Sequence, residues 1–361
     1  MSPVVFIERK EHLTPIKRVR VAEGRDLERG LRLDRNERVD VWPPEFLADV
    51  FSAVPPYFLS VYPESGSLYA KLARFHGVDE DELLLTSGID GGIKTVFEVA
   101  TEPGDVVGIV TPTYAMYQVY ARIFDVQPFA LGYTPDFDLE SIDDLLAKSP
   151  SVFFLPNPNQ PIESVFSVAE LAEIAQKTLE RNCLFVIDEA YHMFGAESAV
   201  ELVREYENVV VARTFSKGFG VPSIRLGYLI SNRDNIEALA KPRFAHESNS
   251  LTNAVAEHLL DHLDLVEDYN RRVVESREHL KTVLGEMGIP ARGIAANFLL
   301  LDLESTERAR AFVEELRAKT IYVKGPWAEP WGRYVTITLG PVETMDRFLE
   351  AVESFVAAGV R

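Results

Sequence analysis

Short apolar segments alternate with amphipathic segments through the first two thirds of this chain, and that alternation limits the fold more than any other feature. The apolar segments lack the every-second-residue alternation of a sheet that has one face in solvent. Amphipathic stretches with helical spacing lie between most of them. We expect strands at residues 83–86, 106–110, 151–155, 183–187 and 209–212. Repeated pairs of strand and helix favour an α/β fold with a mostly parallel sheet that is covered by helices on both faces.

The two ends of the chain differ from this middle part. Residues 1–44 are polar and contain four prolines, which interrupt regular elements, so we expect an N-terminal arm that packs on the small domain or on a partner subunit. After a further strand at 225–231, a charged helical region at 253–285 leads into a smaller set of strands and helices. We therefore predict a large domain at 45–240 and a smaller α/β domain at 241–361.

Charge and cysteine content narrow the range of partners and locations. The chain carries 37 basic and 56 acidic residues, and the resulting net charge of -19 repels phosphate backbones and anionic membrane surfaces. We expect neither nucleic acid nor membrane as a partner. Because Cys183 is the single cysteine and cannot form an internal disulfide, a reducing, cytoplasmic location is predicted.

Polar residues follow each predicted strand, at the position where open α/β sheets bind their ligands. They include a glycine-rich helix start at 86–92, a carboxylate at Asp188 with a tyrosine three residues later, and a lysine at Lys217. The carboxyl ends of parallel strands share one edge of the sheet, so these groups are expected to meet in one crevice. Taken singly, Asp188 could cap a helix and Lys217 could be a solvated lysine.

Two pairs of residues have the spacing of metal ligands but do not form a complete set. Glu189 and His192 match the Glu-x-x-His pattern, yet they follow a strand and have no second copy. His258 and His262 lie four residues apart on a predicted helix without a third ligand. No metal site is predicted.

In combination, the remaining residues resemble the fold type I enzymes that depend on pyridoxal 5'-phosphate, the class I and II aminotransferases, and among them the histidinol-phosphate aminotransferase branch. The segment 213–227 carries this resemblance most specifically, because it looks like the Schiff-base segment, with Lys217 followed eight residues later by Arg225. The segments 188–191, 112–114 and 62–64 match as well. The resemblance implies an aspartate aminotransferase-like large domain with a seven-stranded-type sheet, the smaller C-terminal domain and a homodimer.

The resemblance also implies the roles of individual residues. Lys217 would hold the cofactor as a Schiff base and move protons, Asp188 would keep the pyridine nitrogen protonated, and Tyr191 would bond the phenolic oxygen. Tyr114 would stack on the ring. The cofactor phosphate would be bound by backbone N–H groups and side chains of Ile89, Asp90, Thr214, Ser216, Arg225 and, from the neighbouring subunit, Tyr62.

The first departure from the family pattern lies in the loop after residue 155. The family's Asn-Pro-Asn-Asn-Pro-Thr-Gly is replaced here by a segment in which Gln160 takes the place of the second asparagine of the pair, and Ile162 and Glu163 replace threonine and glycine. The resemblance implies that the replaced asparagine bonds both the phenolic oxygen of the cofactor and the substrate carboxylate, so Gln160 would be a cofactor-binding residue. Gln160 keeps an amide but extends it by one methylene. We expect a reshaped loop.

The second departure removes the arginine that clamps the substrate carboxylate in the family. Alignment on Gly340 places Thr336 at that position, and Arg333 lies an odd number of residues away, which points it to the opposite face of a strand. A β-bulge that shifts this register is the alternative.

These observations predict a pyridoxal-phosphate-dependent aminotransferase that acts on a specialised amino acid or amine through Lys217. Because Gln160 and Thr336 replace carboxylate-binding groups, the alternative is a lyase, decarboxylase or cyclase that acts on a modified amino acid with the same cofactor. A cofactor-binding protein without turnover is the third reading, and the set of Lys217, Asp188, Tyr191 and Arg225 argues against it.

Overall fold

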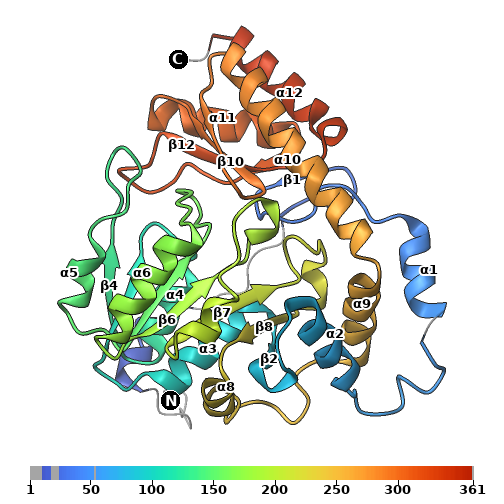
Figure 1. Ribbon diagram of the computed structural model, residues 1–361. Helices are drawn as coiled ribbons and strands as arrows, with labels where there is room; N and C mark the ends of the chain where they lie inside the picture. The colour runs from blue at the N-terminus through green and yellow to red at the C-terminus, as the bar shows by residue number, and fades with distance from the viewer. Residues whose placement is uncertain (1–9, 18–23, 53, 360–361) are drawn as a thin grey trace, which may run out of the picture.

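The computed structural model describes residues 10–17, 24–52 and 54–359. Its centre is a seven-stranded sheet in which only β8 runs antiparallel to its neighbours, which confirms the predicted mostly parallel sheet (Figure 1). The strand order is β2 (Leu83–Thr86), β8 (Gly227–Ile230), β7 (Val209–Thr214), β6 (Leu184–Asp188), β5 (Val152–Pro156), β3 (Val106–Val110) and β4 (Gln127–Leu131).

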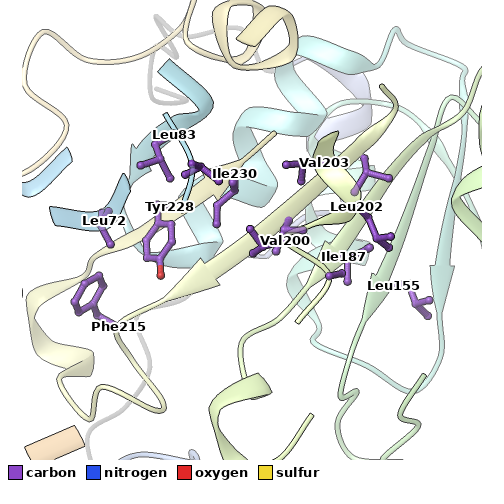
Figure 2. Packing of buried hydrophobic residues seen from close by; sticks show 14 of the residues in the cluster. Leu72, Leu83, Leu155, Ile187, Val200, Leu202, Val203, Phe215, Tyr228 and Ile230 are labelled. Atoms are coloured by element: carbon purple, nitrogen blue, oxygen red, sulfur yellow. The ribbon is translucent and has the colours of Figure 1, made fainter. Parts of the chain in front are cut away.

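Both faces of this sheet are buried, which explains why its strands lack polar alternation. Successive side chains of a strand point to opposite faces, and here Leu83 and Leu85 join one core cluster while Leu84 joins the other. Figure 2 shows part of the first cluster, where Leu83, Tyr228 and Ile230 come from adjacent strands.

Helices from along the chain form the two covering layers. The core cluster that contains Leu84 draws side chains from α3 (Gly88–Ala100), α4 (Met116–Ile123) and α8 (Arg233–Leu239). The cluster that contains Leu83 and Leu85 draws side chains from α1 (Pro44–Ser52), α2 (Gly66–His76), α5 (Ile142–Leu146), α6 (Val168–Leu179), α7 (Leu202–Glu205) and α9 (Ser250–Asp261).

The C-terminal part of the chain builds a second lobe with its own core. A three-stranded antiparallel sheet joins β12 (Tyr334–Thr338), β10 (Phe298–Asp302) and β9 (Ala291–Arg292). Its core includes side chains of α10 (Leu263–Glu286), α11 (Thr306–Ala318) and α12 (Val342–Ala357). The predicted domain boundaries at 44 and 240 stay predictions.

Three features of the fold differ from the sequence-based expectation. The region 253–285, expected as one helical stretch, is divided at His262 between α9 and α10. Strand β4 was not predicted, because it lies at the edge of the sheet, contains Pro128 and exposes most of its side chains. The arm contains β1 (Leu31–Leu33), which pairs in parallel with β11 (Ile321–Val323) of the C-terminal lobe.

Among the described residues, no helix combines the length and the apolar character that crossing a membrane requires.

Candidate active site

A cavity of about 600 Å³ lies between the carboxyl ends of the central strands, the arm and the C-terminal lobe. Ten of the eleven predicted site residues line it: Ile89, Asp90, Tyr114, Gln160, Asp188, Tyr191, Thr214, Ser216, Lys217 and Arg225. The eleventh, Tyr62, lies outside, with 79% of its surface exposed and its ring stacked on His246. Segments from opposite ends of the sequence complete the wall at residues 34–37 and 323–325.

Lys217 projects into the cavity from the turn that follows β7. Its Nζ donates a hydrogen bond to the backbone oxygen of Arg35 at 2.8 Å and lies 5.8 Å from the centre of the Tyr191 ring. Burial lowers the pKa of Lys217 to about 8, against a smaller opposing effect of Glu37. A lysine of this kind is partly neutral near pH 7, as an amine nucleophile must be.

The lowered pKa of Lys217 predicts its reactivity in the protein without cofactor. The neutral fraction of an amine increases as pH rises through its pKa, so labelling of Lys217 by acetic anhydride should increase with a midpoint near pH 8 and level off at higher pH. Quantitative mass spectrometry of the labelled peptides over about pH 6 to 11, a range that includes both the lowered and the ordinary lysine pKa, measures this profile. A labelling profile centred near the ordinary lysine pKa of about 10.4 would contradict it.

Asp188 is the last residue of β6 and is 5% exposed. Its Oδ2 accepts a hydrogen bond from the Tyr117 hydroxyl at 2.6 Å, and its Oδ1 accepts one from the Ala190 amide at 3.0 Å. Burial raises the pKa of Asp188 to about 6, although these two hydrogen bonds oppose the shift. A cationic N–H group placed against this carboxylate would favour its ionised form. Tyr117 was missed by the sequence analysis, although it lies three residues after Tyr114.

The hydroxyl of Tyr191 accepts a hydrogen bond from the Asn36 side-chain amide at 2.9 Å. Asn36 belongs to the arm and adopts a left-handed conformation with φ 53°, which asparagine tolerates better than most residues. Its backbone N–H donates to Thr338 Oγ1 at 2.9 Å, in the C-terminal lobe. Burial raises the pKa of Tyr191, so its hydroxyl keeps its proton at neutral pH.

One end of the cavity is suited to a phosphate group. Here α3 begins, and Ser87 makes no side-chain hydrogen bond that would cap the free amides of its first turn. Gly88 has φ +68°, and a Cβ on it would lie 2.7 Å from an Arg225 nitrogen; a Cβ on Gly227 would lie 2.6 Å from the Ile89 nitrogen. The two glycines therefore let the start of α3 and the Arg225 guanidinium lie close to the same space. Free backbone amides and a guanidinium group together form a favourable binding site for an anion.

The substituted loop after β5 is tied to the C-terminal lobe by Glu163. Ile162 is buried in the core, and Glu163 is 2% exposed. The carboxylate oxygens of Glu163 accept hydrogen bonds from the backbone amides of Ile294 at 2.6 Å and Ala295 at 2.5 Å. Gln160, which lines the cavity, is thus carried by a loop anchored across the two lobes.

Replacing Glu163 by glutamine should destabilise the protein by about 1–3 kcal/mol, because the backbone amide of Ile294 or of Ala295 loses its acceptor. The midpoint of urea denaturation of the cofactor-free protein measures the effect. Glu173→Gln, at an exposed position of α6, is the matched control and should change stability by less than about 0.5 kcal/mol. Equal midpoints for the two variants would show that the bridge does not stabilise the fold.

The structure answers the question of register in β12. Strands β10 and β12 pair without interruption from Phe298 with Thr338 to Asp302 with Tyr334, so the alternative of a bulge is wrong. Arg333 is not among the residues that line the cavity, and its guanidinium donates two hydrogen bonds of 2.6 Å to Asp302. Thr336 is 1% exposed.

The remaining candidate groups are engaged elsewhere. Glu189 forms a buried ion pair with Arg213 at 2.6 Å, and the rings of His258 and His262 stack at 4.2 Å. Within the described part of the chain, no three histidine, cysteine or acidic side chains form a cluster that could hold a metal ion. Cys183 is free and buried.

Comparisons with known proteins agree with this geometry. The family model for aminotransferase class I and II matches residues 55–352. A histidinol-phosphate aminotransferase of Thermococcus gammatolerans is 32% identical over 333 residues, which cover 91% of this chain and 92% of that protein.

Two solved structures share the fold. The histidinol-phosphate aminotransferase from Sinorhizobium meliloti, in complex with pyridoxal 5'-phosphate, matches with a TM-score of 0.83 and 24% identity over 92% of each chain. The L-threonine-O-3-phosphate decarboxylase from Porphyromonas gingivalis matches with a TM-score of 0.76 and 20% identity, over 91% of this chain and 99% of that one.

Proposed function

Because the chain belongs to the class I and II aminotransferase family and is a pyridoxal-phosphate-dependent aminotransferase, we propose that it uses Lys217 to move the amino group of a specialised amino acid or amine. The observation that carries this proposal is that Lys217, Asp188 and Arg225 line one cavity. They supply an amine of lowered pKa, a buried carboxylate and an anion-binding cation.

The described residues fit the cofactor. When bound, pyridoxal 5'-phosphate supplies a ring that withdraws the electron pair left at the substrate's α-carbon. With the cofactor bound, Asp188 would stabilise a protonated ring nitrogen, Tyr191 would donate a hydrogen bond to the phenolic oxygen, and Tyr114 would lie against the ring. The phosphate would be held at the start of α3 by the backbone amides of Ile89 and Asp90, by the hydroxyl groups of Thr214 and Ser216, and by the Arg225 guanidinium.

Lys217 has two tasks in this proposal. Its neutral amine would hold the cofactor, and when the amine is not engaged in this way Lys217 would carry a proton to and from the substrate's α-carbon. The hydrogen bond to the Arg35 carbonyl orients its Nζ while the amine is protonated. Asn36 and Tyr117 act as positioning residues, because they orient Tyr191 and Asp188 respectively.

The experiment that tests the proposal is a titration of the cofactor-loaded protein with single amino donors, followed by visible absorbance and by mass spectrometry of the products. The named relatives make histidinol phosphate the first donor to test. We expect a donor to bleach the visible band, release a carbonyl product and leave a protein whose band a keto acid restores. Transamination would be contradicted if no donor in a broad panel bleached the visible band and no carbonyl product formed.

A second reaction is supported by Gln160 and Thr336, which replace the family's carboxylate-binding groups, and by the presence of a decarboxylase among the proteins with this fold. A lyase, decarboxylase or cyclase would return to its original absorbance after each turnover without a keto acid. The product of such a reaction would retain the amino group, or the reaction would release that group as ammonia.

We further propose a homodimer in which Tyr62 reaches the cofactor phosphate of the neighbouring subunit. Large apolar side chains are exposed along one stretch of the chain, at Leu47, Phe51, Tyr57, Leu59, Val61 and Tyr62. Burial of such a surface against a second copy is favourable. The arm at 1–44, the large cofactor-binding domain at 45–240, the small domain at 241–361 and a cytoplasmic location remain part of this proposal.

Mixing two inactive variants tests the shared site. Tyr62→Ala and Lys217→Ala should each lower activity, and a hybrid dimer of the two should regain it, because one of its two sites then has both native residues. The measurement is activity before and after the variants are mixed, denatured and refolded together. A mixture no more active than the sum of its parts would rule out a site that contains Tyr62 of the neighbouring subunit.

A further inference from the structure

At position 336, where the family pattern places an arginine, the threonine side chain is hydrogen-bonded and buried, so it is closed to a ligand in the cavity. The hydroxyl oxygen of Thr336 accepts a hydrogen bond from the indole N–H of Trp327 at 2.9 Å. With Thr336 buried beneath this indole, a carboxylate has no access to it. A carboxylate of the substrate must therefore be bound by a different side chain of the cavity.

A cation stands directly across the backbone ladder from Thr336. The Lys324 amide donates to the Thr336 carbonyl at 3.0 Å, and the Thr336 amide donates to the Lys324 carbonyl at 2.8 Å. Two residues that exchange both hydrogen bonds form an antiparallel pair whose side chains leave from the same face. Lys324 lines the cavity, and its Nζ lies 4.7 Å from the centre of the Trp327 ring.

The ammonium group of Lys324 is free to bind a ligand. Among the described residues it forms no side-chain hydrogen bond and no ion pair. The nearby carboxylates that could compete are held by Arg25, which contacts Asp34 at 3.0 Å and Glu37 at 3.1 Å. Surrounding protein atoms lower the pKa of Lys324 while the charge of Asp34 opposes that shift.

The other cationic side chains of the cavity are already engaged. In the proposed function Lys217 and Arg225 serve the cofactor. Arg35 is nearly half exposed and lies 3.8 Å from Asp34. Only Lys324 combines a position in the cavity wall, a position opposite Thr336 and an unpaired charge among the described residues.

We propose that Lys324, backed by Trp327, binds the carboxylate of the amino substrate and so replaces the arginine that the family carries at position 336. This inference rests on the proposed function, since it concerns the same cavity with its cofactor bound. Lysine offers a point charge instead of a planar fork, so it holds a carboxylate with less control of orientation. The indole face next to the ammonium restricts it by a cation–π contact.

The test measures binding, so that it does not depend on turnover. Cofactor-loaded protein is titrated calorimetrically with succinate and, separately, with inorganic phosphate. We expect Lys324→Met to raise the Kd of succinate about 10-fold or more, and Lys324→Arg to keep it within about 3-fold, because a charge-assisted hydrogen bond is lost in the first and retained in the second. Lys281→Met, on the surface of α10, is the control and should leave the Kd unchanged.

Three results would overturn the assignment: no succinate binding by the unaltered protein, equal succinate binding by Lys324→Met, or a loss confined to phosphate. A kinetic comparison of L-phenylalanine with phenethylamine, which lacks the carboxylate, adds a second readout. Lys324→Met should lower kcat/KM for the first and leave the second unchanged. If no donor is transaminated, the proposed function fails while the succinate titration still decides the role of Lys324.

Discussion

Lys217→Ala should lower turnover at least about 10³-fold, because the variant loses both the amine that attaches the cofactor and the group that moves the proton at the α-carbon. Its fold should persist, since among the described residues the Lys217 side chain makes one hydrogen bond, to the Arg35 carbonyl, and belongs to no hydrophobic core of either lobe. Turnover with a donor identified for the unaltered protein measures the effect.

A second measurement tests directly whether the cofactor is attached covalently to Lys217. After borohydride reduction, the intact mass of the unaltered protein should include the cofactor, whereas that of Lys217→Ala should not. Lys281→Ala, on the surface of α10, should retain both the added mass and the activity. Full turnover by Lys217→Ala, or covalent cofactor at another lysine, would refute the assignment of Lys217.

Asp188→Asn should lower kcat about 10²- to 10³-fold, because it removes the negative charge that, in the proposed function, stabilises a protonated ring nitrogen. The asparagine oxygen can still accept a hydrogen bond from the Ala190 amide or the Tyr117 hydroxyl, so the variant should retain its shape. Steady-state kinetics together with the Kd of the cofactor measure the two effects separately.

Tyr117→Phe is the matched control for the carboxylate. It removes one hydrogen bond to Asp188 but no charge, so kcat should fall by less than about 10-fold. Because the Tyr117 hydroxyl lowers the pKa of Asp188, the acidic limb of the pH profile should move to higher pH in this variant. An Asp188→Asn variant as active as Tyr117→Phe would show that the charge is not needed.

The sequence was most informative where function depends on residues that follow a strand directly. Asp188 ends β6, and Lys217 comes three residues after the end of β7, so each is placed by its own short stretch of chain. The parallel sheet then brings these strand ends to one edge. For this reason ten of the eleven predicted residues line a single cavity, without any knowledge of the packing around them.

Contacts between segments that are distant in the chain could not be predicted from the sequence in this way. Asn36 meets Thr338 across 302 positions of the chain, and Glu163 meets Ala295 across 132. An asparagine in a polar arm and a glutamate in a loop are ordinary in sequence, because nothing local distinguishes a buried partner from a solvated side chain. Their roles depend on how the two lobes and the arm pack together.

The sequence by itself determined the α/β fold and, through its resemblance to a known family, indicated the cofactor and the loss of the arginine at position 336. The motifs that carry this resemblance are short and lie at strand ends and in the turns that follow them. Only the tertiary structure decided that Trp327 covers Thr336 and that Lys324 faces it with an uncommitted charge. The physical reason is that strand alternation fixes the face on which a side chain lies, whereas pairing of separate segments fixes what lies opposite it.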